Sequence, residues 1–288
     1  MAAGSMQDIK RRIKSVTSTE HITNAMKLVS AGKLRKAKAI FEKTNENSHY
    51  ITNTIAELFN NSKEIPEKYL AGSRDINTTC YITVTSSRGL CGGFNSNILK
   101  EAQSRIDLGS EKPVIIAIGT KAKEYFEKRG YNVYSDYLAP PENISAIETR
   151  EMVRPIIEMY NKGEIDEIVL IYTAFISSME QEVRSIRLLP FEIESDPEVI
   201  RDAKTVEYEP SIEEVFNYLV PKYVEMMLYA AVVESATCEH AARRMAMENA
   251  TDSAREMLDT LSLNYNRARQ SAITDEIIEI VAGSEAQN

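Results

Sequence analysis

Apolar residues near the start of the chain recur at helical intervals. Steps of three and four connect most of them: Met6, Ile9, Ile13, Val16, then Ile22, Met26, Val29, then Leu34, Ala37 and Phe41. From Met6 to about Asn61 there is no Pro, and Gly32 is the only Gly. The pattern predicts a helix about 80 Å long. Its apolar face shifts phase twice, which is typical of a coiled coil with stutters.

A second long helix is predicted at the other end of the chain. From Ser211 to about Ala282 the only helix breaker is Pro221, which we expect to begin or kink the helix. Apolar positions repeat here in 4-3 steps: Ala254, Leu258, Leu261, Tyr265, Ala268 and Ala272. At about 110 Å this helix would extend beyond the first one. Small residues should let the two helices approach closely: Ala230, Ala231, Ala236, Ala241 and Ala242.

The middle of the chain alternates between strand-like and helix-like segments. Strands are predicted at 78–86, 112–119, 132–137, 166–173 and 183–191, and helices near 94–106, 120–129 and 148–162. This alternation predicts a Rossmann-like α/β domain with a mostly parallel five-stranded sheet. Three segments follow: an N-terminal coiled-coil helix (1–64), the α/β domain (77–195) and a C-terminal helix (211–288). The terminal helices must pair antiparallel, because one leads into the domain and the other returns from it.

Charge is distributed unevenly along this acidic chain. The formal net charge of −9 and a pI near 5.1 argue against nucleic-acid binding. From Met6 to Lys43, however, ten Lys and Arg residues face only three acidic ones. The run of Lys33, Arg35, Lys36 and Lys38 is the densest part. It is either an ordinary solvated helix face or a partner-binding surface.

The cysteines, the apolar runs and the first residues of the sequence all bear on the cellular location of the chain. Cys80, Cys91 and Cys238 lack zinc-type spacing and cannot all pair within one chain. No run of about 18 apolar residues is present. The first five residues, MAAGS, have neither the apolar core of a secretion signal nor the composition of a transit peptide. We therefore expect a cytoplasmic location, which still allows peripheral attachment to a membrane complex.

A Gly-rich turn is the most enzyme-like feature of the sequence. Ser86 to Asn97, SSRGLCGGFNSN, lies between a predicted strand and a predicted helix, where phosphates often bind. A P-loop requires Lys and Ser or Thr after its last Gly, but Phe and Asn follow here, and the glycines do not fit GxGxxG either. We interpret Gly89, Gly92 and Gly93 as a structural turn.

No other pattern indicates catalysis or a cofactor. His21, His49 and His240 are far apart and lack a second ligand at helical spacing, so no metal site is predicted. GxSxG, HExxH and kinase-type motifs are absent from the sequence. The stretch from Ile273 to Val281 would expose much apolar surface on a lone helix end, which predicts that a partner encloses it.

Five blocks of the sequence resemble the gamma subunit of F-type ATP synthases. They are MQDIKRRIKSV (6–16), ITNAMKLVSAGKLRKA (22–37), GLCGGFN (89–95), EHAARRMAMENATD (239–252) and YNRARQSAITDEIIEIVAG (265–283). The resemblance implies a rotor without an active site of its own. It implies as partners the alpha and beta subunits of the catalytic hexamer, the epsilon subunit and the membrane ring of c subunits. Because the chloroplast insertion and a transit peptide are missing, it implies the cytoplasmic face of a bacterial plasma membrane.

The resemblance also implies roles for individual residues. Those facing the hexamer would be Met26, Lys33, Arg35, Lys36, Arg269, Gln270, Thr274, Glu276 and Glu279. Tyr208 and Glu209 resemble residues near the c-ring and epsilon, on the basis of a three-residue match. Two functions from other classes remain as alternatives to a rotor: a Rossmann-like nucleotide-dependent enzyme with helical arms, and a static coiled-coil adaptor. The subunit composition of the purified complex would distinguish the three.

Overall fold

Two very long helices begin and end the chain, and an α/β domain lies between them in sequence. The computed structural model describes residues 2–62, 65–72, 75–109, 112–192 and 208–285. Helix α1 spans Ala2–Asn61 and α5 spans Ile212–Glu285. Both predicted helices are confirmed. Pro221 lies inside α5 and does not begin it, which leaves a kink, the other predicted alternative, as a prediction.

By contacts, the chain forms two compact units. One consists of Met1–Ala31 and Arg243–Asn288, and the other of Gly32–Ala242. The first therefore contains the outer parts of both long helices, and the second contains their inner parts together with the sheet. The three segments predicted from the sequence (1–64, 77–195 and 211–288) divide the chain at the ends of helices and strands, not within the long helices. These segment boundaries stay a prediction.

The α/β domain is built on one five-stranded sheet. Its strands are β1 (Thr79–Val84), β2 (Val114–Ile118), β3 (Val133–Tyr137), β4 (Glu167–Phe175) and β5 (Gln181–Leu189). The order is β3-β2-β1-β4-β5, and only β5 runs antiparallel to its neighbour. The predicted mostly parallel sheet is confirmed.

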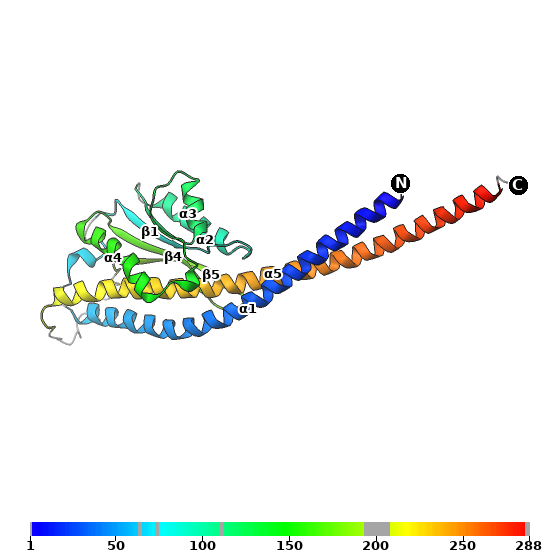
Figure 1. Cartoon of the computed structure of the whole chain (residues 1–288). Helices are drawn as coiled ribbons and strands as arrows, with labels where there is room; N and C mark the ends of the chain where they lie inside the picture. The colour runs from blue at the N-terminus through cyan, green and yellow to red at the C-terminus, as the bar shows by residue number, and fades with distance from the viewer. Residues whose placement is uncertain (1, 63–64, 73–74, 110–111, 193–207, 286–288) are drawn as a thin grey trace. The chain divides into compact units, whose positions relative to one another are not determined.

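Helices cover both faces of this sheet (Figure 1). On one face, α2 (Phe94–Leu108) and α3 (Thr120–Glu127) pack against alternate residues such as Tyr81 and Ile115. On the other, α4 (Ala146–Lys162) and the inner parts of α1 and α5 pack against Ile82 and Ile116. Every residue of β1 is buried, because a strand in the middle of a doubly covered sheet has no solvent face.

Short 3₁₀ helices connect some of these elements. They are η1 (Glu67–Tyr69) and η2 (Pro141–Asn143). A capping box follows η2 and begins α4: the Ser145 hydroxyl accepts a hydrogen bond from the Glu148 amide at 3.2 Å, and the Glu148 carboxylate accepts one from the Ser145 amide at 2.7 Å. The cap fixes where α4 begins and so holds the segment that carries Glu142.

The buried positions of α1 follow an unbroken heptad pattern. Residues with buried or half-buried side chains recur in 3-4 steps from Met6 to Leu58. Thr23 and Ser30 occupy this pattern, whereas Ile22 and Val29 are 60% and 61% exposed. The predicted phase shifts are therefore wrong, as is the assignment of Ile22 and Val29 to the apolar face. Hydrophobicity alone misses a helix interface that uses small polar residues.

Candidate partner-binding surfaces

The outer parts of α1 and α5 pair antiparallel in the first unit. The hydroxyls of Thr23 and Thr251 lie 2.8 Å apart, and both residues are buried. Arg255 of α5 donates to the carboxylate of Glu20 of α1 at 3.0 Å. The predicted 4-3 positions of α5 are confirmed, since Ala254 is buried and Leu258, Leu261, Tyr265, Ala268 and Ala272 are half-buried among exposed neighbours.

The end of α5 extends past the start of α1 within this unit (Figure 1). The register of the paired residues brings Ala2 level with about Ala272, so no described residue of α1 lies opposite the rest of α5. Five large apolar side chains beyond this point are about half exposed or more: Ile273, Ile277, Ile278, Ile280 and Val281. An isolated helix end with this much exposed apolar surface is typical of a binding surface.

Most of the predicted site residues on α5 lie at or near this end. Arg269, Gln270, Thr274 and Glu276 are exposed. The side chain of Glu279 lies outside the described residues. The Thr274 hydroxyl donates to the Gln270 carbonyl at 2.9 Å, a bond within the helix that leaves the neighbouring polar groups available to a partner.

The predicted residues on α1 differ in their surroundings. Met26 is half-buried in the first unit. Lys33 of the second unit pairs with Glu142. Arg35 and Lys36 are exposed and make no ion pair within the described residues. Lys38 pairs with Glu42 on the same helix. Two cations of the basic run are thus paired within the chain, and Arg35 and Lys36 are left for solvent or a partner.

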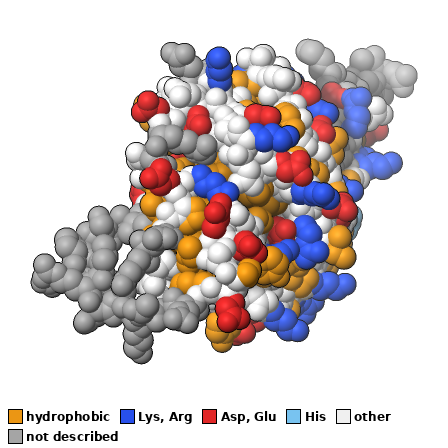
Figure 2. Space-filling view, turned by 90° about the vertical axis from the view of Figure 1, so that its left-hand side faces the viewer, with side chains coloured by type: hydrophobic (Ala, Val, Ile, Leu, Met, Phe, Trp, Pro, Cys, Tyr) orange, Lys and Arg blue, Asp and Glu red, His pale blue; other side chains and the backbone are white. Residues whose placement is uncertain are grey.

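The two residues predicted to lie near the c-ring and epsilon also differ from each other in exposure. Tyr208 is half-buried and packs against the core of the α/β domain, whereas Glu209 is exposed. Figure 2 shows one face of the molecule on which basic and acidic side chains are interspersed, with hydrophobic side chains between them. Such a mixed surface fits a protein partner better than a polyanion.

Hydrogen bonds within the Gly-rich turn use its own polar groups. Asn95 accepts from the Ser86 amide at 3.0 Å and donates to the Cys91 sulfur at 3.2 Å. Gly92 adopts a positive φ of 57°, and Gly93 precedes the first residue of α2. Cys91 is buried. The side chains of Ser86, Cys91 and Asn95 therefore point at one another, and the turn contains no lysine that could meet a phosphate.

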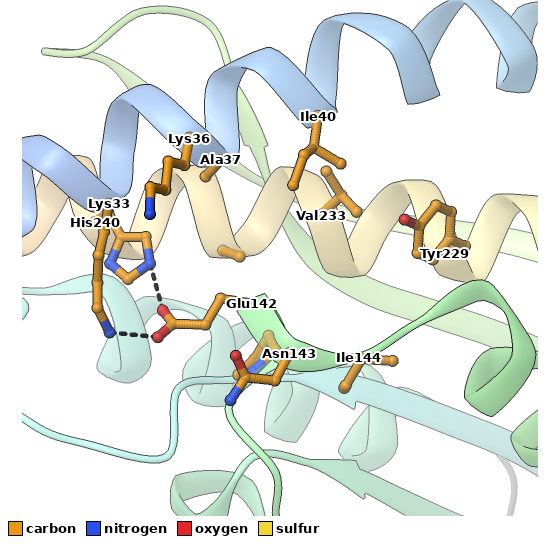
Figure 3. Close-up of a pocket in the computed structure, with 12 residues that line it drawn as sticks. Lys33, Lys36, Ala37, Ile40, Glu142, Asn143, Ile144, Tyr229, Val233 and His240 are labelled. Atoms are coloured by element: carbon orange, nitrogen blue, oxygen red, sulfur yellow. Dashed lines mark hydrogen bonds and ion pairs between the residues drawn. The ribbon is translucent and has the colours of Figure 1, made fainter.

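A charged cluster in the second unit was not predicted. Glu142 of η2 binds Lys33 of α1 through one carboxylate oxygen and His240 of α5 through the other, as Figure 3 shows. The hydrogen bond from His240, together with that from Lys33, lowers the pKa of Glu142 to about 2 despite its partial burial. Sequence spacing could not reveal the cluster, because Glu142 and His240 are far apart in the chain.

A cavity of about 280 Å³ opens beside this cluster. Its walls come from α1, η2 and α5, and most of the lining is apolar: Ala37, Ile40, Ile144, Tyr229, Val233 and Ala236. Lys33, Lys36, Glu142, Asn143 and His240 form its polar part. The Nδ1 atom of His240 is buried and has no hydrogen-bond partner within the described residues.

Other ionisable groups in the domain core are kept neutral. Burial raises the pKa of Cys80 to about 12 and also raises the pKa of Cys238. Both thiols are therefore protonated at neutral pH and unsuited to nucleophilic chemistry. Among the described residues, no helix has the length and apolar character to cross a bilayer.

These features define a class of protein in which an α/β domain is inserted between two long terminal helices that pair antiparallel. In this class, the end of the C-terminal helix extends beyond its partner and exposes apolar side chains. A family model described as ATP synthase matches residues 5–287. The ATP synthase gamma chain of Alkaliphilus metalliredigens is 44% identical over 285 residues, covering 98% of both chains. That of Moorella thermoacetica is 39% identical over 282 residues, again covering 98% of both. The chain belongs to the ATP synthase gamma chain family.

The fold is also found in solved structures. A chain in the cryo-EM structure of Euglena gracilis mitochondrial ATP synthase, OSCP/F1/c-ring in rotational state 3, matches with a TM-score of 0.69. The match covers 99% of this chain and 95% of that one, at 19% sequence identity. At this identity the likeness supports the fold alone.

Proposed function

We propose that this chain is the central rotor shaft of an F-type ATP synthase. It couples the ion-driven rotation of a membrane c-ring to ATP synthesis in the hexamer of alpha and beta subunits, and it transmits rotation in the reverse direction during ATP hydrolysis. The observation that carries the proposal is the end of α5, where isoleucines project beyond the helix pair. A socket in the hexamer would remove this apolar surface from water, at about 25 cal/mol per Å² buried.

The outer face of α1 supports the same role. Ile22, Leu28 and Val29 are all at least 60% exposed although the heptad positions beside them are filled by other residues. In a helix pair that worked alone, these apolar groups would face water. Enclosure within the hexamer accounts for them, and it places Met26 where a soft thioether can slide past a partner without forming a fixed bond.

Polar side chains near these apolar surfaces would transmit torque. Arg269 and Gln270 contact a beta subunit transiently, with Thr274, Glu276 and Glu279 in the same terminal stretch. Arg35 and Lys36 face acidic residues of the beta subunits, and Lys33 does so when it leaves Glu142. Tyr208 and Glu209 lie toward epsilon and the c-ring.

The proposed shaft is non-catalytic. The Gly-rich turn lacks the lysine and hydroxyl of a P-loop, and Ser86, Cys91 and Asn95 hydrogen-bond to one another. ATP chemistry therefore belongs to the beta subunits. The chain associates peripherally with the membrane through the complex, on the cytoplasmic face of the bacterial plasma membrane.

Subunit stoichiometry tests this function. The tagged chain, co-expressed with its host's alpha and beta subunits, should purify with three copies of each per copy of itself, as measured by native mass spectrometry. ATP should then drive rotation of a bead attached to the α/β domain. A chain that purifies alone and binds ATP would support the nucleotide-dependent enzyme, and a stable complex without rotation would support the static adaptor.

A further inference from the structure

The charged cluster beside the cavity contains three potential metal ligands. The carboxylates of Glu142 and Glu239 and a ring nitrogen of His240 lie within 4.8 Å of one another. Glu239 and His240 are buried, with 6% and 2% of their surfaces exposed. Exposed acidic groups often gather without binding an ion, but here one acid and the imidazole are buried and the second acid is half-buried.

The types of ligand define the ion that would fit. One imidazole nitrogen and two carboxylate oxygens suit Zn²⁺, which completes a tetrahedron with a water or another oxygen. The neighbouring cavity has room for that water, and the side chain of Asn143 lines it. The Nε2 atom of His240 faces the Glu142 carboxylate, so it is the ring nitrogen that would bind the ion.

We propose that Glu142, Glu239 and His240 form a divalent-metal site, with Zn²⁺ as the best-fitting ion. The ion enters between Glu142 and His240, which now contact each other directly. A metal ion takes the lone pair of an imidazole nitrogen, so binding would displace the proton that His240 Nε2 donates to Glu142. Glu142 lies on the short η2 segment, and its side chain is partly exposed, which lets it move by the small amount that coordination requires.

Lys33 gives the site a distinctive electrostatic property. Its ammonium group binds the other oxygen of Glu142 and thereby holds that carboxylate in place. The same positive charge repels a cation a few ångströms away. Removing the charge of Lys33 should therefore strengthen metal binding, whereas removing any of the three ligands should weaken it.

Binding would have a structural consequence. Glu142 belongs to η2, and Glu239 and His240 belong to α5, so one ion would cross-link the loop to the helix. A ligand that binds only the folded state raises its stability in proportion to the logarithm of ligand concentration. We expect Zn²⁺ to raise the melting temperature of the chain and Mg²⁺, which prefers oxygen ligands, to have little effect.

Isothermal titration calorimetry of the full-length chain with ZnCl₂, after dialysis against a chelator, tests the site. One Zn²⁺ should bind per chain at about pH 7.5, more weakly at about pH 6, and with release of protons detected as a dependence on buffer ionisation enthalpy. Glu142→Gln and His240→Gln should each weaken binding by about tenfold or more. Lys33→Gln should tighten it severalfold.

His49→Gln is the matched control, because His49 is an exposed histidine of α1 outside the cluster. It should bind Zn²⁺ like the unchanged chain. Circular dichroism will show whether each variant is folded, and the expected gain of affinity in Lys33→Gln cannot arise from misfolding. Absence of binding at about 100 μM Zn²⁺ would overturn the proposal. So would binding that His240→Gln and Glu142→Gln leave unchanged, or that Lys33→Gln weakens.

Discussion

In the α/β domain, one glycine lies where two backbone segments approach so closely that a side chain would not fit between them. Gly119 follows β2 and has a φ of +90°, and a Cβ there would lie 2.2 Å from the Thr85 carbonyl oxygen. Thr85 also donates to the Ile118 carbonyl at 3.2 Å and accepts from the Ala122 amide at 2.9 Å. The backbone at Thr85 therefore cannot move away without breaking the connection between β1, β2 and α3.

The same Gly→Ala substitution should therefore have opposite effects on the free energy of unfolding at two positions. Gly119→Ala should lower the free energy of unfolding by about 2–4 kcal/mol, because strain and a clash with backbone add together. Gly32→Ala should raise it by about 0.5–1 kcal/mol, since Gly32 lies inside α1 and a Cβ there meets nothing within 4 Å. Urea denaturation of both variants measures the difference. Equal effects would contradict the steric argument.

Local signals in the sequence concern the Gly-rich turn. The structure gives Gly92 a positive φ and places Gly93 directly before α2, and the sequence shows no P-loop lysine in this turn. The cluster of Glu142, Glu239 and His240 was not predicted, because Glu142 lies far from the other two residues in the sequence. Only the fold brings η2 beside α5, and no local pattern records that proximity.

At the scale of elements, every predicted strand and helix is present, and the error concerns the face of α1. The two phase shifts were inferred from Ile22 and Val29, which turned out to be exposed. The true interface continues through Thr23 and Ser30 in an unbroken heptad. Hydrophobicity in the sequence does not distinguish an apolar outer face of a helix from the face that packs inside a helix pair.

The buried hydroxyl pair of this interface leads to a testable coupling. Thr251 also hydrogen-bonds to the Met247 carbonyl at 2.7 Å, and Thr23 to the Glu20 carbonyl at 3.0 Å. Replacing one threonine by valine leaves the other hydroxyl against a methyl group. Thr23→Val and Thr251→Val should each cost about 1 kcal/mol.

The double variant should be no less stable than either single variant. When both partners become apolar and keep their shape, no unpaired hydroxyl remains in the interface. A double-mutant cycle from thermal or urea denaturation gives the coupling energy. Strictly additive losses would show that the two hydroxyls do not depend on each other.

At the scale of the whole chain, stability and function should separate at the end of α5. The proposed socket requires residues that contribute little to folding: beyond Ala272 no described part of α1 faces α5, and the isoleucines there are exposed. The sequence predicted this overhang from helix lengths alone. It could not identify which exposed side chains contact a partner, because that depends on the surface of another subunit.

Truncation after Leu261 tests the separation. The shortened chain loses Tyr265, Ala268, Arg269 and the isoleucines, but it keeps the α/β domain and the pairing around Thr23 and Thr251. We expect a folded chain whose affinity for the hexamer falls and whose torque is lower, because the apolar end is stabilised only inside its socket. Circular dichroism, co-purification with alpha and beta subunits, and single-molecule rotation measure the three quantities.

The matched variant, Arg269→Ala with Gln270→Ala, keeps the apolar end and removes only two exposed polar side chains. It should assemble almost normally but hydrolyse ATP more slowly, because a polar contact that forms and breaks in each turn is missing. The two variants thus test separately the apolar part of the α5 end, which we propose seats the shaft, and the polar part, which we propose engages the beta subunits. Wild-type turnover in the double alanine variant would remove the role of Arg269 and Gln270 and leave the socket intact. Undiminished torque in the truncated chain would instead show that the pairing of α1 with α5 suffices to drive the hexamer.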